Sequence, residues 1–396
     1  MVSVTNDNSV ANNIAVVIIL LMAIGTVFVF SASANINQNI DLQRFYEYPA
    51  LRQLLFFPLA ALIIYSVSCM DYRRLSLEKG WHKSLTGYLL ILCIAVLMLV
   101  LYQRFHPILP QLIPKINQHY RWLKIPAGPI SISFQPSELA KWLLIFFLAG
   151  FCAKYSDSMK LFKKRFLPMC LFIGLVVGLI IVEDFGTAAF IAVLAFLLLM
   201  VAGAKLLYLL APLPVGLLAF FLAIIVSPTR IYRITAFLHP EQFTEGINYQ
   251  PSQSLIALGS GGLWGKGLGR GICKYGHLPE DTTDFIFAII GEELGFVGTA
   301  GVILLFVIFV WLGIQVVMRC SDRFGQLLAA GIVFAIGMQA ALNIGVVTVV
   351  LPTKGIPLPF VSAGGTSMLL SAAAVGILMN IAKQTGNEPI PGENLS

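Results

Sequence analysis

Acidic side chains are scarce in this chain, and several of them fall inside or at the ends of long apolar stretches. Only 19 of the 396 residues are Asp or Glu. A carboxylate in or beside a membrane-spanning helix is costly unless it is paired or functional, so these positions are the first candidates for chemistry. Such a group can take a proton from a substrate or help to bind one. The candidates are Glu138, Glu183, Asp184, Asp284, Glu292 and Glu293.

The positions of these acids allow structural as well as functional roles. Glu138 lies three residues before Lys141, so the two share one helix face, either as a paired cap or as an ion or substrate contact. Glu183 and Asp184 precede an apolar helix, and at least one of them is expected only to complement the helix dipole. Asp284 begins another apolar stretch and is either the acidic member of a helix cap or a catalytic base.

Two irregular segments add candidate binding groups. Seven glycines lie in the thirteen residues from Gly259 to Gly271, with Lys266 among them. This glycine content is too high for a helix, and it lets backbone N–H groups approach an anion closely. The segment from Leu351 to Thr366 contains three prolines and Lys354. It predicts a stiff re-entrant turn that walls a site, with Lys354 pointing into it.

The composition places these residues in a membrane protein. The chain is 58% hydrophobic and 11% charged, and its mean hydropathy is +0.86. These values exclude a soluble fold. The net charge of +7 is explained by Lys and Arg retained on the cytoplasmic side rather than by nucleic-acid binding. The six cysteines predict neither a disulfide framework nor a metal site.

Hydrophobic windows of about 20 residues predict an all-α polytopic membrane protein with ten transmembrane helices. One membrane domain, residues 14–381, is expected between the cytoplasmic tails 1–13 and 382–396. The predicted helices are Ile14 to Ser33, Leu54 to Met70, Leu85 to Tyr102, Ser137 to Ala153, Phe166 to Val182, Phe185 to Val201, Leu206 to Val226, Leu294 to Val317, Leu327 to Val350 and Thr366 to Ile381.

Basic residues predict the orientation of these helices. Lys and Arg cluster in the loops after the second and fourth helices, which are therefore expected in the cytoplasm. Ten crossings then place both termini in the cytoplasm. The large loop between helices 7 and 8, residues 227–283, is predicted to be extracytoplasmic.

Five stretches of the chain together resemble the SEDS family (FtsW/RodA type), whose members act in shape, elongation, division and sporulation. The resemblance spans nearly the whole chain and is carried by Gln135 to Lys141, Glu183 to Ala188, Tyr249 to Gly271, Leu278 to Gly298 and Leu351 to Thr366. It implies a peptidoglycan glycosyltransferase that polymerises lipid II at the outer face of the bacterial inner membrane. The glycine-rich segment and the Leu-Pro-Thr-Lys-Gly turn look more like those of division members, which implies septal wall synthesis.

The resemblance also implies roles for individual residues. Asp284 matches the essential aspartate of the family and is the expected general base. Thr282 and Ala363 depart from the family pattern, which has His and Tyr at those places, so the resemblance implies no role for these two side chains. The expected substrate-binding residues, several of them cations for the pyrophosphate, are Arg230, Arg233, Lys266, Lys354, Glu138, Lys141, Arg121, Trp122 and Ser362.

Partners and cofactors follow from the same resemblance. The expected partner is a class B penicillin-binding protein, a single-pass transpeptidase, together with other divisome proteins. A mobile glycine-rich loop that the partner orders would explain activation by contact. Fixed cations or a divalent cation, Mg²⁺ or Mn²⁺, would stabilise the departing pyrophosphate.

Three other functions remain open at this point. A transporter that flips lipid II fits ten helices equally well, although a carrier is expected to bind near the bilayer midplane. An elongation polymerase of the RodA type differs from a division enzyme only in biological role. A non-catalytic scaffold that recruits a transpeptidase would tolerate loss of Asp284.

Overall fold

The protein, a computed structural model, is described for residues 8–33, 48–78, 80–116, 119–127, 130–155, 162–239, 249–274 and 282–385. In this part of the chain nine helical stretches are at least 18 residues long and apolar enough to cross a membrane, and α6 is a shorter apolar helix. Together they match the ten predicted crossings, so the all-α polytopic prediction is confirmed. The crossings are α1 (Asn8–Ser33), α2 (Pro49–Ser68), α3 (Leu85–Phe105), α4 (Pro136–Lys154), the π-helical turn η5 (Phe162–Phe166) with α5 (Leu167–Ile181), α6 (Phe185–Val201), α7 (Leu206–Leu210) with α8 (Leu213–Ile225), α11 (Ile286–Arg319), α12 (Arg323–Val347) and α13 (Gly365–Thr385).

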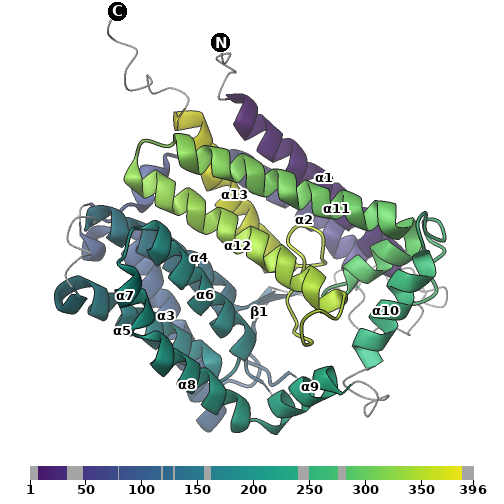
Figure 1. The fold of residues 1–396 in the computed structure, drawn as a ribbon, viewed down its shortest axis with the longest axis horizontal. Coiled ribbons are helices and arrows are strands. Elements are labelled where there is room, and N and C mark those ends of the chain that lie inside the picture. Colours follow the sequence, from purple (N-terminus) through teal and green to yellow (C-terminus); the bar gives the residue numbers. More distant parts are fainter. Residues whose placement is uncertain are drawn as a thin grey trace, which may run out of the picture.

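The centre of the bundle is α12, which packs against α4, α6, α11 and α13. Figure 1 shows α11 and α12 lying side by side, and α1 packs on α2, α11 and α13. The first turn of α1 and the last turn of α13 lie at the same end of the bundle (Figure 1), as an even number of crossings requires. The opposite end, where α3, α5, α8 and α12 terminate, is called the outer end below.

Several helix boundaries differ from the predicted ones. The first helix begins at Asn8, inside the predicted tail 1–13, and the last continues to Thr385. The seventh crossing is divided into α7 and α8 at Pro212, because proline lacks the N–H that a continuous helix needs. The eighth begins at Ile286 rather than Leu294, since its polar Gly-Glu-Glu stretch is helical although it lowers the local hydropathy.

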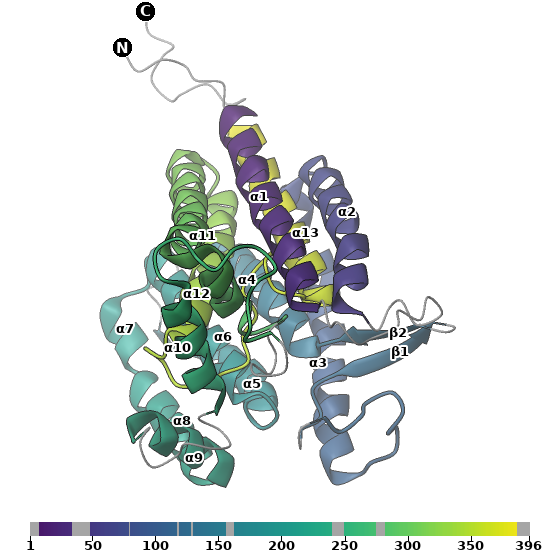
Figure 2. The ribbon, with the colours of Figure 1, turned by 90° about the vertical axis from the view of Figure 1, so that its right-hand side faces the viewer.

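Shorter elements occupy the connections. Two helices, α9 (Pro228–Leu238) and α10 (Tyr249–Gly261), lie in the segment predicted as one large loop. The hairpin of β1 (Leu123–Ala127) and β2 (Ile130–Phe134) pairs antiparallel, with Leu123 opposite Phe134. Figure 2 shows that this hairpin projects away from the helices. It was not predicted from the sequence. The two 3-10 helices η2 (Tyr72–Leu75) and η3 (Trp81–Lys83) connect α2 to α3.

The long helix α11 is broken at Gly295, where φ is 68° and ψ is −160°. Such a φ favours glycine, and a Cβ at this position would collide with the backbone of Leu263. The segment after α10 crosses the break and supplies four backbone hydrogen bonds. These run from Lys266 N to Glu292 O, Gly267 N to Glu293 O, Phe296 N to Gly262 O and Val297 N to Leu263 O. The glycine-rich segment therefore satisfies polar groups that the break exposes inside a membrane helix.

Candidate functional site

Asp284 lies directly before α11, half-buried at the outer end of the bundle. The predicted cap would make Asp284 the acid three residues after Asp281, which lies outside the described residues. The N-cap residue of α11 is Phe285, so Asp284 lies before the helix rather than in its first turn. Asn343 of α12 donates from Nδ2 to Asp284 O at 2.8 Å and to Ile356 O at 2.7 Å. One buried amide therefore fixes both the start of α11 and the turn that follows α12.

Ser362 has a structural position in this turn. Its side chain is buried, and its hydroxyl donates to Thr283 O and accepts from Leu358 N at 2.7 Å. The next residue, Ala363, donates its N–H to Thr282 O at 2.9 Å. The two residues that depart from the family pattern thus meet through backbone atoms. The hydroxyl of Ser362 holds the backbone before Asp284, and its predicted contact with substrate stays a prediction.

Lys354 and Gly355 bring the re-entrant turn against Asp284 and α6. A Cβ at residue 355 would lie 2.9 Å from Asp284 Oδ2, so the carboxylate rests against the glycine backbone. The stem of Lys354 crosses the first turn of α6, where a Cβ on Gly186 would lie 2.1 Å from Lys354 Cε. Burial lowers the pKa of Lys354, whereas the charge of Asp184 raises it. A cation therefore lies between the Asp284 region and the start of α6.

The second acid of the pair before α6 is a helix cap. Asp184 Oδ1 accepts from Thr187 N at 3.0 Å, and its Oδ2 accepts from Thr187 Oγ1 at 2.8 Å. Gln135, just before α4, donates from Nε2 to Asp184 Oδ2 at 2.8 Å. The prediction that at least one of Glu183 and Asp184 serves the helix N-terminus is confirmed for Asp184.

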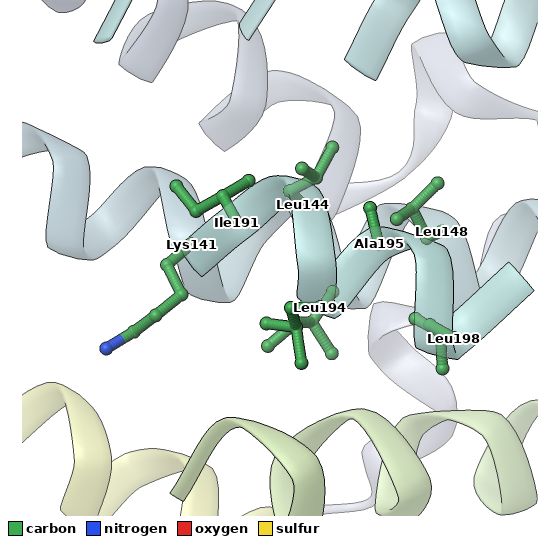
Figure 3. A pocket seen from close by; sticks show the side chains of 8 residues that line it. Lys141, Leu144, Leu148, Ile191, Leu194, Ala195 and Leu198 are labelled. Carbon is green, nitrogen blue, oxygen red and sulfur yellow. The ribbon is translucent and has the colours of Figure 1, made fainter. Parts of the chain in front are cut away.

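Glu138 and Lys141 form a buried ion pair in the first turns of α4. Lys141 Nζ lies 2.8 Å from Glu138 Oε2 and donates to Gln339 Oε1 at 2.9 Å, with the Lys141 side chain only 1% exposed. Ser367 Oγ donates to Glu138 Oε2 at 3.0 Å, and Gln339 Nε2 donates to Pro357 O at 3.0 Å. Figure 3 shows Lys141 at the edge of an apolar pocket, with its ammonium group pointing away from the leucines that line the pocket. These contacts favour the paired-charge interpretation over a direct substrate contact.

Arginines gather around the turn between α5 and α6. Arg121 donates from Nε to Glu183 O at 2.6 Å, and Arg104 Nη1 lies 2.8 Å from Glu183 Oε1. Burial lowers the pKa of Arg230, as do the charges of Arg121 and Arg104, while the nearby carboxylates raise it. Arg233 is exposed and close enough to Arg121 for their charges to interact. The outer end thus holds a cluster of four guanidinium groups.

Arg230 also connects three elements. From α9 it donates through Nη1 to Ala223 O at 2.7 Å and through Nη2 to Ile181 O at 3.0 Å. Its guanidinium lies 4.9 Å from the centroid of the Phe185 ring. Arg230 therefore binds carbonyls near the ends of α8 and α5. Trp122, beside Arg121 in the sequence, is half-buried.

Lys266 lies apart from this cluster, in an ion pair with Glu292. The distance from Lys266 Nζ to Glu292 Oε1 is 2.7 Å, and the Glu292 side chain is 0% exposed. Glu292 also accepts from Ile272 N at 2.8 Å and from Cys273 N at 3.1 Å. This pairing gives Lys266 a structural partner, and its predicted contact with pyrophosphate stays a prediction.

Glu293 is equally enclosed. It accepts from Ser31 Oγ of α1 at 2.7 Å, from Lys274 Nζ at 2.9 Å and from Gly269 N at 3.0 Å. The glycine-rich segment was predicted to approach an anion through its backbone N–H groups. The anions that it approaches are the carboxylates of Glu292 and Glu293 within the same chain.

A small cavity of about 20 Å³ lies beside the arginine cluster, which is room for one water molecule. Its polar lining comes from Tyr120, Arg121, Ser137, Glu183 and Asp184. In the described part of the chain no three His, Cys, Asp or Glu side chains come together as metal ligands would. The described residues therefore offer no protein-only metal cage.

Several residues of this region were missed from the sequence. Arg104, Gly186 and Gly355 carry no local signal, because their roles depend on partners far away in the chain. Gln339 and Asn343 do carry one. They lie four residues apart in an otherwise apolar helix, and polar side chains on one face of a membrane helix predict a polar partner.

Comparisons with known proteins agree with the motifs and the fold. Residues 11–387 match the model of the FtsW/RodA/SpoVE family, described as cell cycle proteins. The chain is 35% identical to stage V sporulation protein E of Bacillus subtilis, over 93% of this chain and 96% of that protein. It is 36% identical to the probable peptidoglycan glycosyltransferase FtsW of Coxiella burnetii, over 93% of this chain and 94% of that protein.

Solved structures share the fold. A chain from a peptidoglycan synthase complex matches with a TM-score of 0.69 and 22% identity, covering 94% of this chain and 97% of that one. The crystal structure of RodA from Thermus thermophilus matches with a TM-score of 0.62 and 24% identity, covering 94% of this chain and 96% of that one. With the family model matching nearly the whole length, the chain belongs to the FtsW/RodA/SpoVE family, which is the SEDS family that its motifs resemble.

Proposed function

We propose that this protein is a peptidoglycan glycosyltransferase that polymerises lipid II at the outer face of the bacterial inner membrane, for septal wall synthesis. The observation that carries the proposal is the half-buried Asp284 at the outer end, against the turn whose Lys354 reaches the start of α6. The guanidinium groups gather at the same turn between α5 and α6. Relatives named as probable peptidoglycan glycosyltransferase FtsW support it, at 35% to 36% identity over more than nine tenths of the chain.

The proposed reaction needs a base and fixed positive charge. The acceptor sugar hydroxyl attacks the anomeric carbon of the donor, and its proton passes to the Asp284 carboxylate. The bond between that carbon and the pyrophosphate oxygen breaks, and the lipid pyrophosphate leaves with the electron pair. Arg121, Arg230, Arg233 and Lys354 are the cations proposed to stabilise its charge. The buried pair Glu138 and Lys141 is proposed to brace α4 behind the site.

We propose that a divalent cation binds to this protein only when the pyrophosphate of the substrate is also present to hold it. Mg²⁺ is usually bound by one or two carboxylates plus substrate phosphates rather than by a protein cage. Asp284 is a carboxylate that fits such a shared site, and Mg²⁺ or Mn²⁺ would there neutralise charge on the pyrophosphate. Removing divalent cations with a chelator should slow polymerisation if this role holds.

The orientation is proposed from charge. Basic residues dominate the connections at the end opposite the outer end, and by the positive-inside rule that end, with both termini, faces the cytoplasm. These residues are Arg73, Arg74, Lys83, Lys154, Lys163, Lys164, Arg165, Arg319 and Arg323. Labelling of single cysteines introduced near both termini in intact cells tests the assignment.

The deciding experiment uses purified protein in detergent with lipid II as the substrate. A polymerase forms glycan strands without a second compartment, whereas a transporter produces none. Asp284→Asn should form no strands, and Arg233→Ala or Lys354→Ala should weaken donor use more than folding. Absence of strands from the unmodified protein under all conditions, including with its partner, would overturn the proposed function.

A class B penicillin-binding protein is the proposed partner. Because residues 261–274 are packed on Glu292 and Glu293, activation by contact would act through the rest of the outer connections more than through this segment. Adding a transpeptidase whose own serine is disabled should raise the rate of strand formation. An unchanged rate at saturating partner would contradict the activation.

A further inference from the structure

The turn between α5 and α6 is a point of convergence for arginines from other elements. Arg104 ends α3, Arg121 precedes β1, and Arg230 belongs to α9, yet each contacts residues 181–184 or their carbonyls. Arg104 Nη1 lies 2.8 Å from Glu183 Oε1, Arg121 Nε lies 2.6 Å from Glu183 O, and Arg230 Nη2 lies 3.0 Å from Ile181 O. A single turn thus fixes three guanidinium groups.

Glu183 has the central position in this turn. Its side chain is 5% exposed, and its second carboxylate oxygen accepts from Tyr120 N at 2.9 Å and lies 3.4 Å from His119 Nδ1. Burial raises the pKa of Glu183, but contacts to His119, Arg104 and Tyr120 N lower it by more, to about 2. The carboxylate is therefore charged at every pH at which the protein would work.

These contacts hold the residues before the hairpin at two points. The carboxylate of Glu183 binds the backbone of Tyr120, and the carbonyl of Glu183 binds the side chain of Arg121. Arg121 also lines the small cavity beside Asp184, and its terminal nitrogens make no hydrogen bond to another described residue. The Nε of Arg121 fixes the guanidinium group in place, and its terminal nitrogens can still donate hydrogen bonds to an anionic ligand.

A carboxylate among anion-binding cations has a physical reason here. Three cations lie at this turn, Arg104, Arg121 and Arg230, together with the two carboxylates of Glu183 and Asp184. The cluster therefore keeps a net positive charge. Asp184 is used as the cap of α6. Without the Glu183 carboxylate, the three guanidiniums would repel one another, and the backbone N–H of Tyr120, next to Arg121, would lose its acceptor. Preorganised charge is what stabilises a developing anion.

We infer that Glu183 is a positioning residue, which holds Arg121 in place to receive the departing pyrophosphate. The inference rests on the proposed function and deepens it. Glu183 does not touch substrate; it acts through Arg121 and the segment from His119 to Arg121. Glu183 is neither a helix cap nor a direct ligand of the substrate, because both of its carboxylate oxygens and its carbonyl oxygen accept hydrogen bonds from the protein.

A double-mutant cycle tests the inference. Glu183→Gln keeps the size of the side chain and removes its charge, and we expect kcat for lipid II polymerisation to fall about tenfold or more while KM changes by less than about threefold. Arg121→Ala should cost at least as much. In the Arg121→Ala background, Glu183→Gln should cost less than about twofold, because it acts through the missing arginine.

A merely structural role gives a different result. Glu183→Gln would then lower kcat by the same factor in both backgrounds, in parallel with the melting temperature, and this additivity would overturn the inference. Asp322→Asn is the matched control, since Asp322 accepts from Tyr72 Oη at 2.9 Å and caps α12 at the other end of the bundle. It should lower the melting temperature without the loss of kcat.

A second variant covers the case in which Glu183→Gln does not fold. Arg121→Lys keeps the positive charge but lacks the Nε donor that contacts Glu183 O, and a tenfold loss of kcat is expected. A wild-type kcat in Arg121→Lys would overturn the inference. The proposed function fails separately, when the unmodified protein forms no strands, whereas the positioning role fails when strands form and the losses are additive.

Discussion

Two acidic sites at the start of α11 lie eight residues apart and have opposite surroundings. Asp284 is half-buried at the outer end, and its carboxylate rests against the backbone of Gly355. Glu292 and Glu293 are fully buried, and Lys266, Lys274 and backbone N–H groups of the glycine-rich segment occupy their oxygens. Scarcity of acids in the sequence does not separate the two kinds. Burial does, because a carboxylate enclosed by the protein cannot reach a substrate hydroxyl, whereas a half-buried one can.

The strongest test of this contrast is Asp284→Asn. If Asp284 is the general base, the change should lower kcat for polymerisation by about 10²- to 10⁴-fold. The melting temperature should change by no more than about 2 °C, because the exchange is nearly isosteric and the backbone contacts remain. Strand formation from purified lipid II and thermal unfolding of the same preparation measure both quantities. Activity within a factor of three of the unmodified protein would remove Asp284 from the chemistry.

Glu293→Ala should lower the melting temperature, which Asp284→Asn should leave nearly unchanged. It leaves the ammonium of Lys274, which is 1% exposed, buried without its carboxylate. Breaking a buried pair on one side costs about 3–5 kcal/mol, or roughly 5 °C in melting temperature for a protein of this size. Glu78→Ala, an exposed acid in the connection between α2 and α3, is the control and should change nothing. The contrast is wrong if Glu293→Ala unfolds at the temperature of the control.

Glu183 is a buried carboxylate inside the proposed site, and pH tests its state. Its pKa is lowered from 4.5 to about 2, which corresponds to about 3 kcal/mol of stability. Because the folded pKa is depressed, this stability is present above about pH 4.5 and is lost as pH falls toward 2. Thermal unfolding from pH 6 to pH 2 should show the unmodified protein and Glu183→Gln converging at low pH. Parallel curves throughout this range would show that Glu183 does not gain its charge stabilisation on folding.

The sequence predicted the helices of this protein because membrane helices are long apolar runs whose backbone must be satisfied within each segment. It could not predict the break at Gly295, because the compensating N–H and C=O groups come from a segment about 30 residues earlier in the chain. The hairpin was missed as well. Its strands are five residues each and contain Lys124, Pro126 and serines, which do not alternate clearly between apolar and polar.

The candidate site was predicted only in part, because contacts between residues far apart in the chain depend on the fold. Arg230 and Lys354 were singled out from their types and places, Arg121 from the family resemblance and Asp284 from both. The structure places Arg121 and Arg230 around one turn. Lys266 has the same residue type and a similar place in the outer connection, but its partner Glu292 is 26 residues away. Pairing of this kind is a property of the fold, so charge pattern alone could not distinguish the paired lysine from the available cations.

The smallest expected effect concerns the glycine against which Asp284 rests. Gly355→Ala would place a methyl group 2.9 Å from Asp284 Oδ2, closer than carbon and oxygen normally approach, so the carboxylate or the turn must shift by a fraction of an ångström. A misplacement of about 1 Å can cost about 10²-fold in rate, so a shift of this size should lower kcat by about tenfold with little change in melting temperature. Gly259→Ala in α10 is the matched control, because a Cβ there has open space, and it should leave kcat unchanged. Equal rates for the two variants would mean that catalysis tolerates a shift of the Asp284 carboxylate by this amount.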